Sequence, residues 1–196
     1  MNFEQLDNAV KPQDDAYAFA VSHDGQPMAE ESGVSAAAVD AFDAGNLRMA
    51  CQQYANAVAC FERAIAHSPQ VPEFFFNRAN ALAALKRFEE ALISYDTAIG
   101  QRPDYAQAHS NRGNTLYALG QYFEAIESFD TAILFEPEMG EAHLNRGNAL
   151  IRLKQYVAAF QSYEAAIACN ADLVEAIFNK GIALQIMLSE QGQSAA

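Results

Sequence analysis

Apolar residues follow a helical period from Ala38 onward, and the pattern comes in paired blocks. Two stripes with spacings of three and four occupy residues 72–105: Phe75, Ala79, Leu82 and Leu85, then Phe88, Ala91, Leu92, Tyr95, Ala98 and Ile99. Such spacing predicts two amphipathic helices. We expect a turn with a left-handed residue near Lys86 (Gly120 in the next block), and Pro103 ends the second helix. Each block pair therefore predicts an antiparallel helix pair.

This helix pair returns every 34 residues. Small residues, aromatic residues and prolines recur in register: Gly45, Ala79, Gly113, Gly147 and Gly181; Tyr54, Phe88, Tyr122 and Tyr156; Ala57, Ala91, Ala125 and Ala159; Phe61, Tyr95, Phe129 and Tyr163; Ala64, Ala98, Ala132 and Ala166; Pro69, Pro103 and Pro137. Such a period predicts a repeat array. Its units are 38–71, 72–105, 106–139 and 140–173, followed by a closing helix over 174–188 and a tail over 189–196. We number positions within each unit and expect the small residue at position 8 to face the alanine at position 20.

The first 37 residues differ from the array. They contain seven acidic residues, one lysine and the helix breakers Pro12, Gly25, Pro27 and Gly33. High charge and breakers predict a largely mobile acidic segment over 1–37.

The spacing of Gly113, Tyr122, Ala125, Phe129 and Pro137 resembles the tetratricopeptide repeat. The resemblance covers the units 38–173 and the half-unit that follows. It implies an all-α fold, a right-handed α-solenoid of helix-turn-helix repeats. It also implies a concave inner face lined by the first helix of each unit, where positions 6 and 9 lie.

Asparagines recur at positions 6 and 9 of the units, and apolar residues lie between them. An asparagine amide can bond both the N–H and the C=O of an extended backbone. We therefore expect peptide binding by Asn77, Asn80, Asn111, Asn114, Asn145, Asn148, Asn179, Phe76, Tyr117 and Leu144. The asparagine rows resemble those in the repeat arm of O-linked N-acetylglucosamine transferases. The alternative is that the amides, common at these positions in bacterial arrays, only bridge adjacent helices.

Other polar residues in register have structural explanations. Arginine or lysine at position 7 recurs with an acid at position 25, which predicts ion pairs between helices. His109 and His143 share one position in successive units, so their spacing needs no metal, and no Cys or Glu cluster completes a ligand set. No catalytic triad or phosphate-binding loop occurs. We expect no enzyme activity, no metal and no cofactor.

The net charge of −13 narrows the choice of partner. It disfavours nucleic acids and anionic membranes and favours a neutral or basic peptide. Only Arg152 is basic in the expected groove, against Glu73, Glu141 and Glu175, so a clamp for a carboxylate-ended chaperone tail is not expected. Three cysteines without CxxC spacing and a start without a secretory signal predict a cytoplasmic protein, and the periplasm stays open as the alternative.

The closing helix is apolar on more than one face, although terminal repeats need a polar outer surface. We expect it to self-associate through Phe178, Ile182, Ile186, Met187 and Leu188. Three functions stay open. The first is a noncatalytic module that binds an extended peptide in its groove. The others are the substrate-recruiting arm of a larger enzyme, such as a glycosyltransferase, and a self-associating scaffold.

Overall fold

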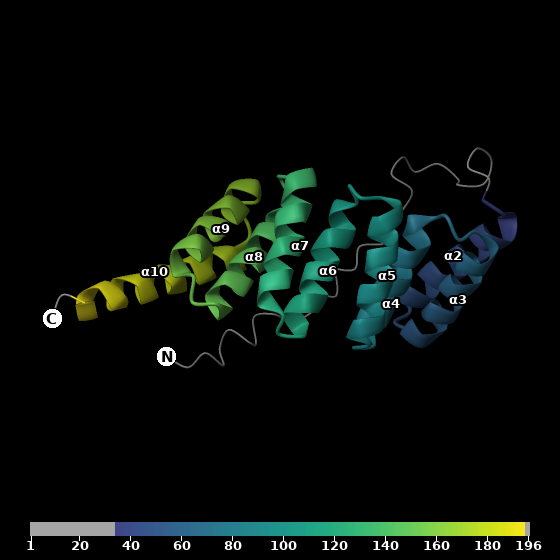
Figure 1. Ribbon diagram of the computed structural model, residues 1–196, viewed down its shortest axis with the longest axis horizontal. Coiled ribbons are helices and arrows are strands. Elements are labelled where there is room, and N and C mark those ends of the chain that lie inside the picture. Colours follow the sequence, from purple (N-terminus) through teal and green to yellow (C-terminus); the bar gives the residue numbers. More distant parts are fainter. Residues whose placement is uncertain (1–33, 195–196) are drawn as a thin grey trace. The chain divides into compact units, whose positions relative to one another are not determined.

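The structure is a computed structural model that describes residues 34–194, with side chains to residue 189. These residues form nine helices and no strand (Figure 1). The helices are α2 (Ala36–Ala50), α3 (Tyr54–His67), α4 (Pro72–Ala84), α5 (Phe88–Gln101), α6 (Ala106–Ala118), α7 (Tyr122–Phe135), α8 (Gly140–Arg152), α9 (Tyr156–Cys169) and α10 (Val174–Ser194). The predicted acidic segment lies outside the described residues up to residue 33, and the end of the predicted tail does so from residue 195.

The chain divides into two compact units, with the division between Thr115 and Leu116 inside α6. We call the described part of each the first unit (34–115) and the second unit (116–194). The first helix of each repeat is a helix A (α2, α4, α6, α8 and α10), and the second is a helix B (α3, α5, α7 and α9). Within each unit, helices A and B alternate along the chain, so the predicted helix-turn-helix order is confirmed.

Left-handed residues close the A–B turns, as predicted. The backbone φ is 59° at Lys86 and Lys154, 57° at Gln52 and 76° at Gly120. The N–H of Arg87 then donates to the carbonyl of Leu82, which ends helix A. A lysine with positive φ is strained. The strain persists because helix B must fold back against helix A to bury its apolar stripe.

The predicted stripes form the cores. In the first unit the ring of Phe42 lies 4.9 Å from that of Phe74 and 5.8 Å from that of Phe61. In the second unit Tyr163, Leu150 and other apolar residues of α8 and α9 are buried together. Each core is shared between successive helices, as expected for an array in which one helix pair cannot bury both of its faces.

The glycine at position 8 makes room for an aromatic ring. A β-carbon on Gly45 would lie 2.4 Å from the Phe61 ring, and one on Gly147 would lie 2.5 Å from the Tyr163 ring. The nearest neighbour of this glycine is therefore the ring, and the expectation that the glycine faces the alanine at position 20 stays a prediction. The ring belongs to position 24, one turn further along helix B. The spacing fixed which residues share a face, but not how far helix B is shifted along helix A.

Helix α10 begins at Val174 as predicted but continues through residue 188 to Ser194. Figure 1 shows it extending past the ends of α8 and α9. In the other repeats, helix A ends because helix B folds back onto it. No helix folds back onto α10 within residues 34–194, so its backbone has no reason to leave the helical conformation.

Candidate interaction surface

The asparagines of positions 6 and 9 connect successive A helices. In the first unit, the Asn77 amide donates to Oδ1 of Asn46 across 3.0 Å, and Asn111 donates in the same way to Asn80 at 3.0 Å. In the second unit the Asn179 amide donates to Oδ1 of Asn148, again at 3.0 Å. In each of these pairs the later repeat donates and the earlier repeat accepts.

Tyrosines of helix B join the same amide oxygens. The Tyr95 hydroxyl donates to Oδ1 of Asn80 at 2.6 Å, and the Tyr163 hydroxyl donates to Oδ1 of Asn148 at 2.9 Å. A carbonyl oxygen has two lone pairs. Two internal donors therefore use the acceptor capacity of Asn80, and the same holds for Asn148. Burial raises the pKa of Tyr163, which keeps its hydroxyl protonated and able to donate.

Most of the predicted asparagines are buried. The exposed fraction is 7% or less for five of the seven: Asn77, Asn80, Asn111, Asn148 and Asn179. Asn114 and Asn145 are half-buried. The bonds between these asparagines match the alternative that the amides bridge adjacent helices. Direct contact between a peptide and the buried five remains a prediction. The likeness of the rows to a transferase arm also remains a prediction.

The three apolar residues predicted for the groove differ in exposure. Phe76 and Leu144 are each only 2% exposed. The Phe76 ring lies 4.9 Å from that of Tyr105 and takes part in the core of the first unit. Tyr117 is half-buried and meets Tyr122 edge-on at 5.2 Å between ring centroids. Of the three, Tyr117 offers the most accessible aromatic surface.

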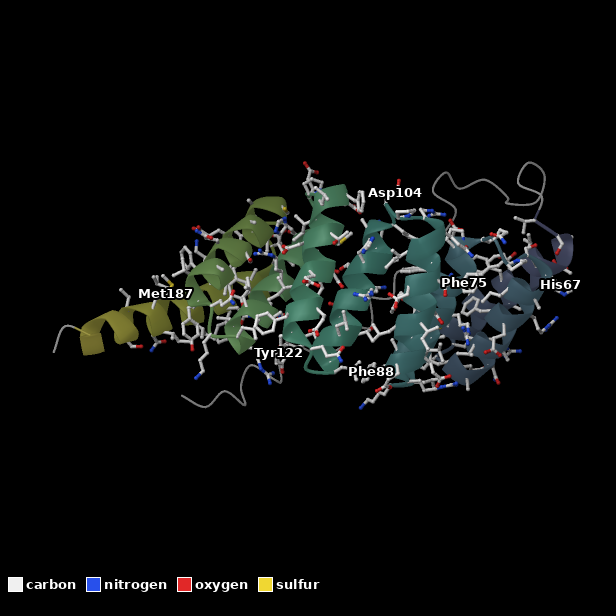
Figure 2. The ribbon with its side chains drawn as sticks, in the orientation of Figure 1. His67, Phe75, Phe88, Asp104, Tyr122 and Met187 are labelled. Atoms are coloured by element: carbon white, nitrogen blue, oxygen red, sulfur yellow. The ribbon has the colours of Figure 1, made fainter. Side chains whose placement is uncertain are left out.

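A guanidinium completes this aromatic pair. Arg152, an exposed residue at the end of α8, lies 4.9 Å from the centre of the Tyr122 ring. Tyr122 is at the start of α7 and is labelled in Figure 2. Two aromatic rings and a cation therefore gather on the second unit. We call Tyr117, Tyr122 and Arg152 the tyrosine–arginine surface. Tyr117 and Arg152 were predicted to lie in the groove, whereas Tyr122 was assigned to the contacts between helices.

Acidic residues of the A helices are partly neutralised or buried. Glu73 forms an ion pair with Arg102, whose guanidinium also lies over the Tyr105 ring. Glu175 is half-buried and accepts a hydrogen bond from the Asn148 amide at 3.4 Å. Burial raises the pKa of Glu175, and hydrogen bonds from the two neighbouring asparagines oppose that shift.

The predicted ion pairs between helices are confirmed. Four basic residues of helix A reach an acid of the preceding helix B: Arg78–Glu62 at 3.3 Å, Arg112–Asp96 at 2.7 Å, Arg146–Asp130 at 2.5 Å and Lys180–Glu164 at 2.9 Å. Arg78 and Arg146 also donate to Ser94 and Ser162 of the following helix B. These arginines therefore connect three consecutive helices and have a structural role.

The two histidines hold turns. His109 Nε2 lies 2.9 Å from the Pro103 carbonyl, and His143 Nε2 lies 3.0 Å from the Pro137 carbonyl. Each bond ties helix A to the proline turn that precedes it. Among the described residues, no three histidine, cysteine, aspartate or glutamate side chains are grouped so as to hold a metal ion. None of the helices in that part of the chain has the length and hydropathy needed to cross a bilayer.

Helix α10 has several exposed apolar side chains. The exposed fraction is 66% for Phe178 and 60% for Leu188, two residues predicted to self-associate. The other three predicted residues, Ile182, Ile186 and Met187, are half-buried, and the last two pack against the core of the second unit (Figure 2). The exposed Val174, Ile177 and Leu184 were not among the five residues predicted to self-associate, although Ile177 and Leu184 belong to the apolar pattern of this helix. Knowledge of which α10 face meets α8 and α9 was needed to find them.

The profile described as "Tetratricopeptide repeat" matches residues 42–106 and 110–173. The chain belongs to the tetratricopeptide repeat family. Both matched ranges span two of the units that the 34-residue period predicts. No curated protein matches the sequence significantly.

Solved tetratricopeptide repeat structures share this fold. One is described as MamA 41-end from Desulfovibrio magneticus RS-1, with a TM-score of 0.74 and 17% identity over 83% of this chain and 91% of that chain. YrrB, described as a TPR protein with an unusual peptide-binding site, has a TM-score of 0.67 and 23% identity over 74% of this chain and 75% of its own. The first TPR of Spaghetti (RPAP3), bound to the HSP90 peptide SRMEEVD, has a TM-score of 0.59 and 26% identity over 60% of this chain and 96% of its own. These likenesses confirm an all-α helical-repeat fold.

Proposed function

We propose that this protein is a noncatalytic interaction module that holds an extended segment of a partner protein against its A helices. The observation that carries the proposal is the internal bonding of the asparagines. Because Asn179 bonds Asn148 and Asn148 bonds Tyr163, the A helices of the second unit are held in one arrangement before any partner arrives. A surface that is ordered in advance binds with a smaller entropic cost.

The tyrosine–arginine surface is the proposed contact on the second unit. Tyrosine presents a large, stiff surface with a polar hydroxyl, and arginine stacks on rings while donating up to five hydrogen bonds. Such groups can bind an extended backbone with little dependence on its sequence. The relatives support a protein ligand: the RPAP3 domain is described in complex with a peptide, and YrrB is described as having a peptide-binding site.

The partner segment is proposed to be neutral or basic. The net charge is −13, and Glu141 is exposed on α8, the helix that carries Arg152. The peptide of the RPAP3 complex contains the acidic run EEVD. A peptide of that charge would meet repulsion here and would find Arg152 as its basic contact on the proposed surface. We also propose a cytoplasmic location, because Cys51, Cys60 and Cys169 are all thiols in the structure.

Peptide display tests the proposal directly. A library of random segments of about 12 residues, the span of four or five repeats at about 3.3 Å per residue, is selected on the full chain. Dissociation constants of the selected peptides are then measured by fluorescence polarisation. We expect micromolar binders without acidic enrichment, and we expect Tyr117→Ala with Arg152→Ala to weaken them by about tenfold or more.

The matched control lies on a helix B. Leu134 on α7 is 74% exposed, so Leu134→Ala removes a comparable apolar surface away from the proposed contact. Its peptide affinity is expected to equal that of the wild type, and circular dichroism should show unchanged helicity for all variants. Equal affinity for the wild type and the Tyr117/Arg152 variant would place the binding elsewhere. The absence of any selected binder would contradict the function itself.

A further inference from the structure

Helix α10 takes the place of a helix A whose covering helix B is absent from the described residues. The same repeat positions can be compared directly. Phe76 on α4 is 2% exposed, whereas Phe178, at the same position 5 on α10, is 66% exposed. At position 8, the Tyr163 ring fills the space above Gly147, while a β-carbon on Gly181 would meet no atom within 4 Å. The uncovered face of α10 is therefore one that the fold buries elsewhere.

This face is continuous and uncharged. It consists of Val174, Ile177, Phe178, Gly181, Leu184 and Leu188. The neighbouring exposed residue Gln185 is polar but neutral. The spacings of three and four residues place these side chains in one stripe along α10, about 20 Å long at 1.5 Å per residue. The charged Lys180 is turned away and bonds Glu164 at 2.9 Å.

We infer that this face binds the same face of a second copy of the chain, as an antiparallel pair of α10 helices centred on Gly181. The face is self-complementary in that arrangement. With Gly181 opposite Gly181 of the other copy, Phe178 is opposite Leu184 and Val174 is opposite Leu188. Four apolar side chains of each copy thus meet apolar partners, and Ile177 is opposite the neutral Gln185. The two glycines allow the helices to approach closely where they cross. Such isologous contacts are the usual basis of twofold dimers.

A head-to-tail contact, in which α10 of one copy packs against α2 of another, is disfavoured by acidic residues on α2. Position 3 is Phe74 in α4, which is fully buried, but it is Asp40 in α2, which is exposed. Position 6 is the buried Asn77 in α4 but the exposed Asp43 in α2. Contact between α10 and this face of α2 would remove two carboxylates from water without partners. A closed pair buries only uncharged residues.

The acidic segment is a poorer occupant than a second α10. Residues 1–33 contain seven acidic residues and one lysine. The face of α10 has no basic residue that would compensate that charge. A second α10 adds only uncharged side chains to this face, and it brings a glycine to the point where the helices must approach most closely.

The small size of the α10 face limits the expected affinity of the dimer. Stable interfaces involve about 20–30 residues on each side, more than this one helix face provides. Each copy also has a net charge of −13, so the two copies repel at low ionic strength. We therefore expect a dimer with a dissociation constant of tens of micromolar, strengthened by added salt.

Sedimentation velocity of the full chain from about 5 to 500 µM tests the dimer. The wild type should shift from monomer to dimer, and Phe178→Glu should raise the dissociation constant at least about tenfold. The matched control is Leu134→Glu, which places the same charge at an exposed apolar site on α7 and should leave the dimer unchanged. A wild type that is monomeric throughout would overturn the inference, because another part of the chain or a different protein would then cover α10.

A charge-exchange pair tests the antiparallel register. Leu184→Lys alone should weaken the dimer much as Phe178→Glu does. When both substitutions are in one chain, each new acid faces the new base of the other copy, so the dimer should recover to within about fivefold of the wild type. Within one helix, positions 178 and 184 are six residues apart, and side chains at that spacing are not neighbours. Recovery of the dimer would therefore come from ion pairs between the two copies. Failure of the double variant to recover, with each single variant folded by circular dichroism, would overturn the proposed pairing.

Discussion

The ring of Tyr163 occupies the space that a side chain on Gly147 would need, with a hypothetical β-carbon only 2.5 Å from the ring. This relationship joins α8 to α9. Its consequence for stability can be tested because the same repeat position is open on Gly181 of α10.

Gly147→Ala is expected to destabilise the second unit by about 1–3 kcal/mol, since the buried ring must shift to admit the methyl group. The matched variant is Gly181→Ala, where no atom of the same copy lies within 4 Å. Both variants are compared at about 1 µM, below the dissociation constant expected for the dimer. Alanine is the better helix former by about 1 kcal/mol, so that variant should be neutral or more stable. Urea unfolding followed by circular dichroism measures both. Equal effects of the two substitutions would show that helix propensity, and not the ring, determines the result.

Asn148→Ala should cost about 2–3 kcal/mol, because it leaves the Tyr163 hydroxyl and the Asn179 amide buried without their acceptor. Tyr163→Phe removes only one donor and should cost about 1 kcal/mol. Phenylalanine occurs naturally at this repeat position as Phe61 and Phe129. Thermal unfolding of both variants gives the comparison. If Asn148→Ala did not lower the unfolding temperature, water would have replaced the amide, and the row of asparagines would add little to stability.

Glu175→Gln is expected to stabilise the second unit at neutral pH. Burial raises the pKa of this carboxyl in the folded state above its ordinary 4.5, so the folded protein favours the neutral form. The favourable contribution is present below the pKa of the unfolded chain and is lost as pH rises through the higher folded pKa. The advantage of glutamine should therefore shrink as pH falls towards 4.5. Urea unfolding of both proteins at several pH values measures the difference, and a glutamine variant that is less stable at pH 7 would contradict the prediction.

The A–B turns offer a paired test of backbone strain. Lys154 has a φ of 59°, so Lys154→Gly should stabilise the second unit by about 0.5–1 kcal/mol. Gly120 has a φ of 76°, and Gly120→Ala should destabilise by about 1 kcal/mol. Opposite signs in chemical unfolding would confirm that the left-handed conformation dominates. If Lys154→Gly also destabilised the protein, the contacts of the lysine side chain would outweigh the strain of its backbone.

The sequence predicted the helix pairs, their turns and the ion pairs because each depends on residues at fixed spacing. Gly147 shows the limit of that reasoning. Its position in the repeat indicated a close contact, but the contacting atom depends on how far α9 is shifted along α8, and that shift is set by packing. The period says nothing about it.

The candidate site was less predictable, and the asparagines show why. An amide such as that of Asn111 has the same hydrogen-bonding groups for a peptide as for a neighbouring helix. Sequence spacing placed it beside other A helices without deciding between the two partners. The bond to Asn80 and an exposed fraction of 7% come from tertiary packing. For α10, the pattern showed excess apolar surface, yet only the packed structure separated Leu184 from Ile186.

The bonds between asparagines affect how the number of repeats can change during evolution. The pairs Asn77–Asn46, Asn111–Asn80 and Asn179–Asn148 each join one repeat to the next, with the donor in the later repeat. A repeat therefore carries both a donor for the repeat before it and an acceptor for the repeat after it. Duplicating or deleting 34 codons within the array would regenerate the same junction without any compensating mutation. Arrays of different length are therefore accessible to this gene by simple recombination.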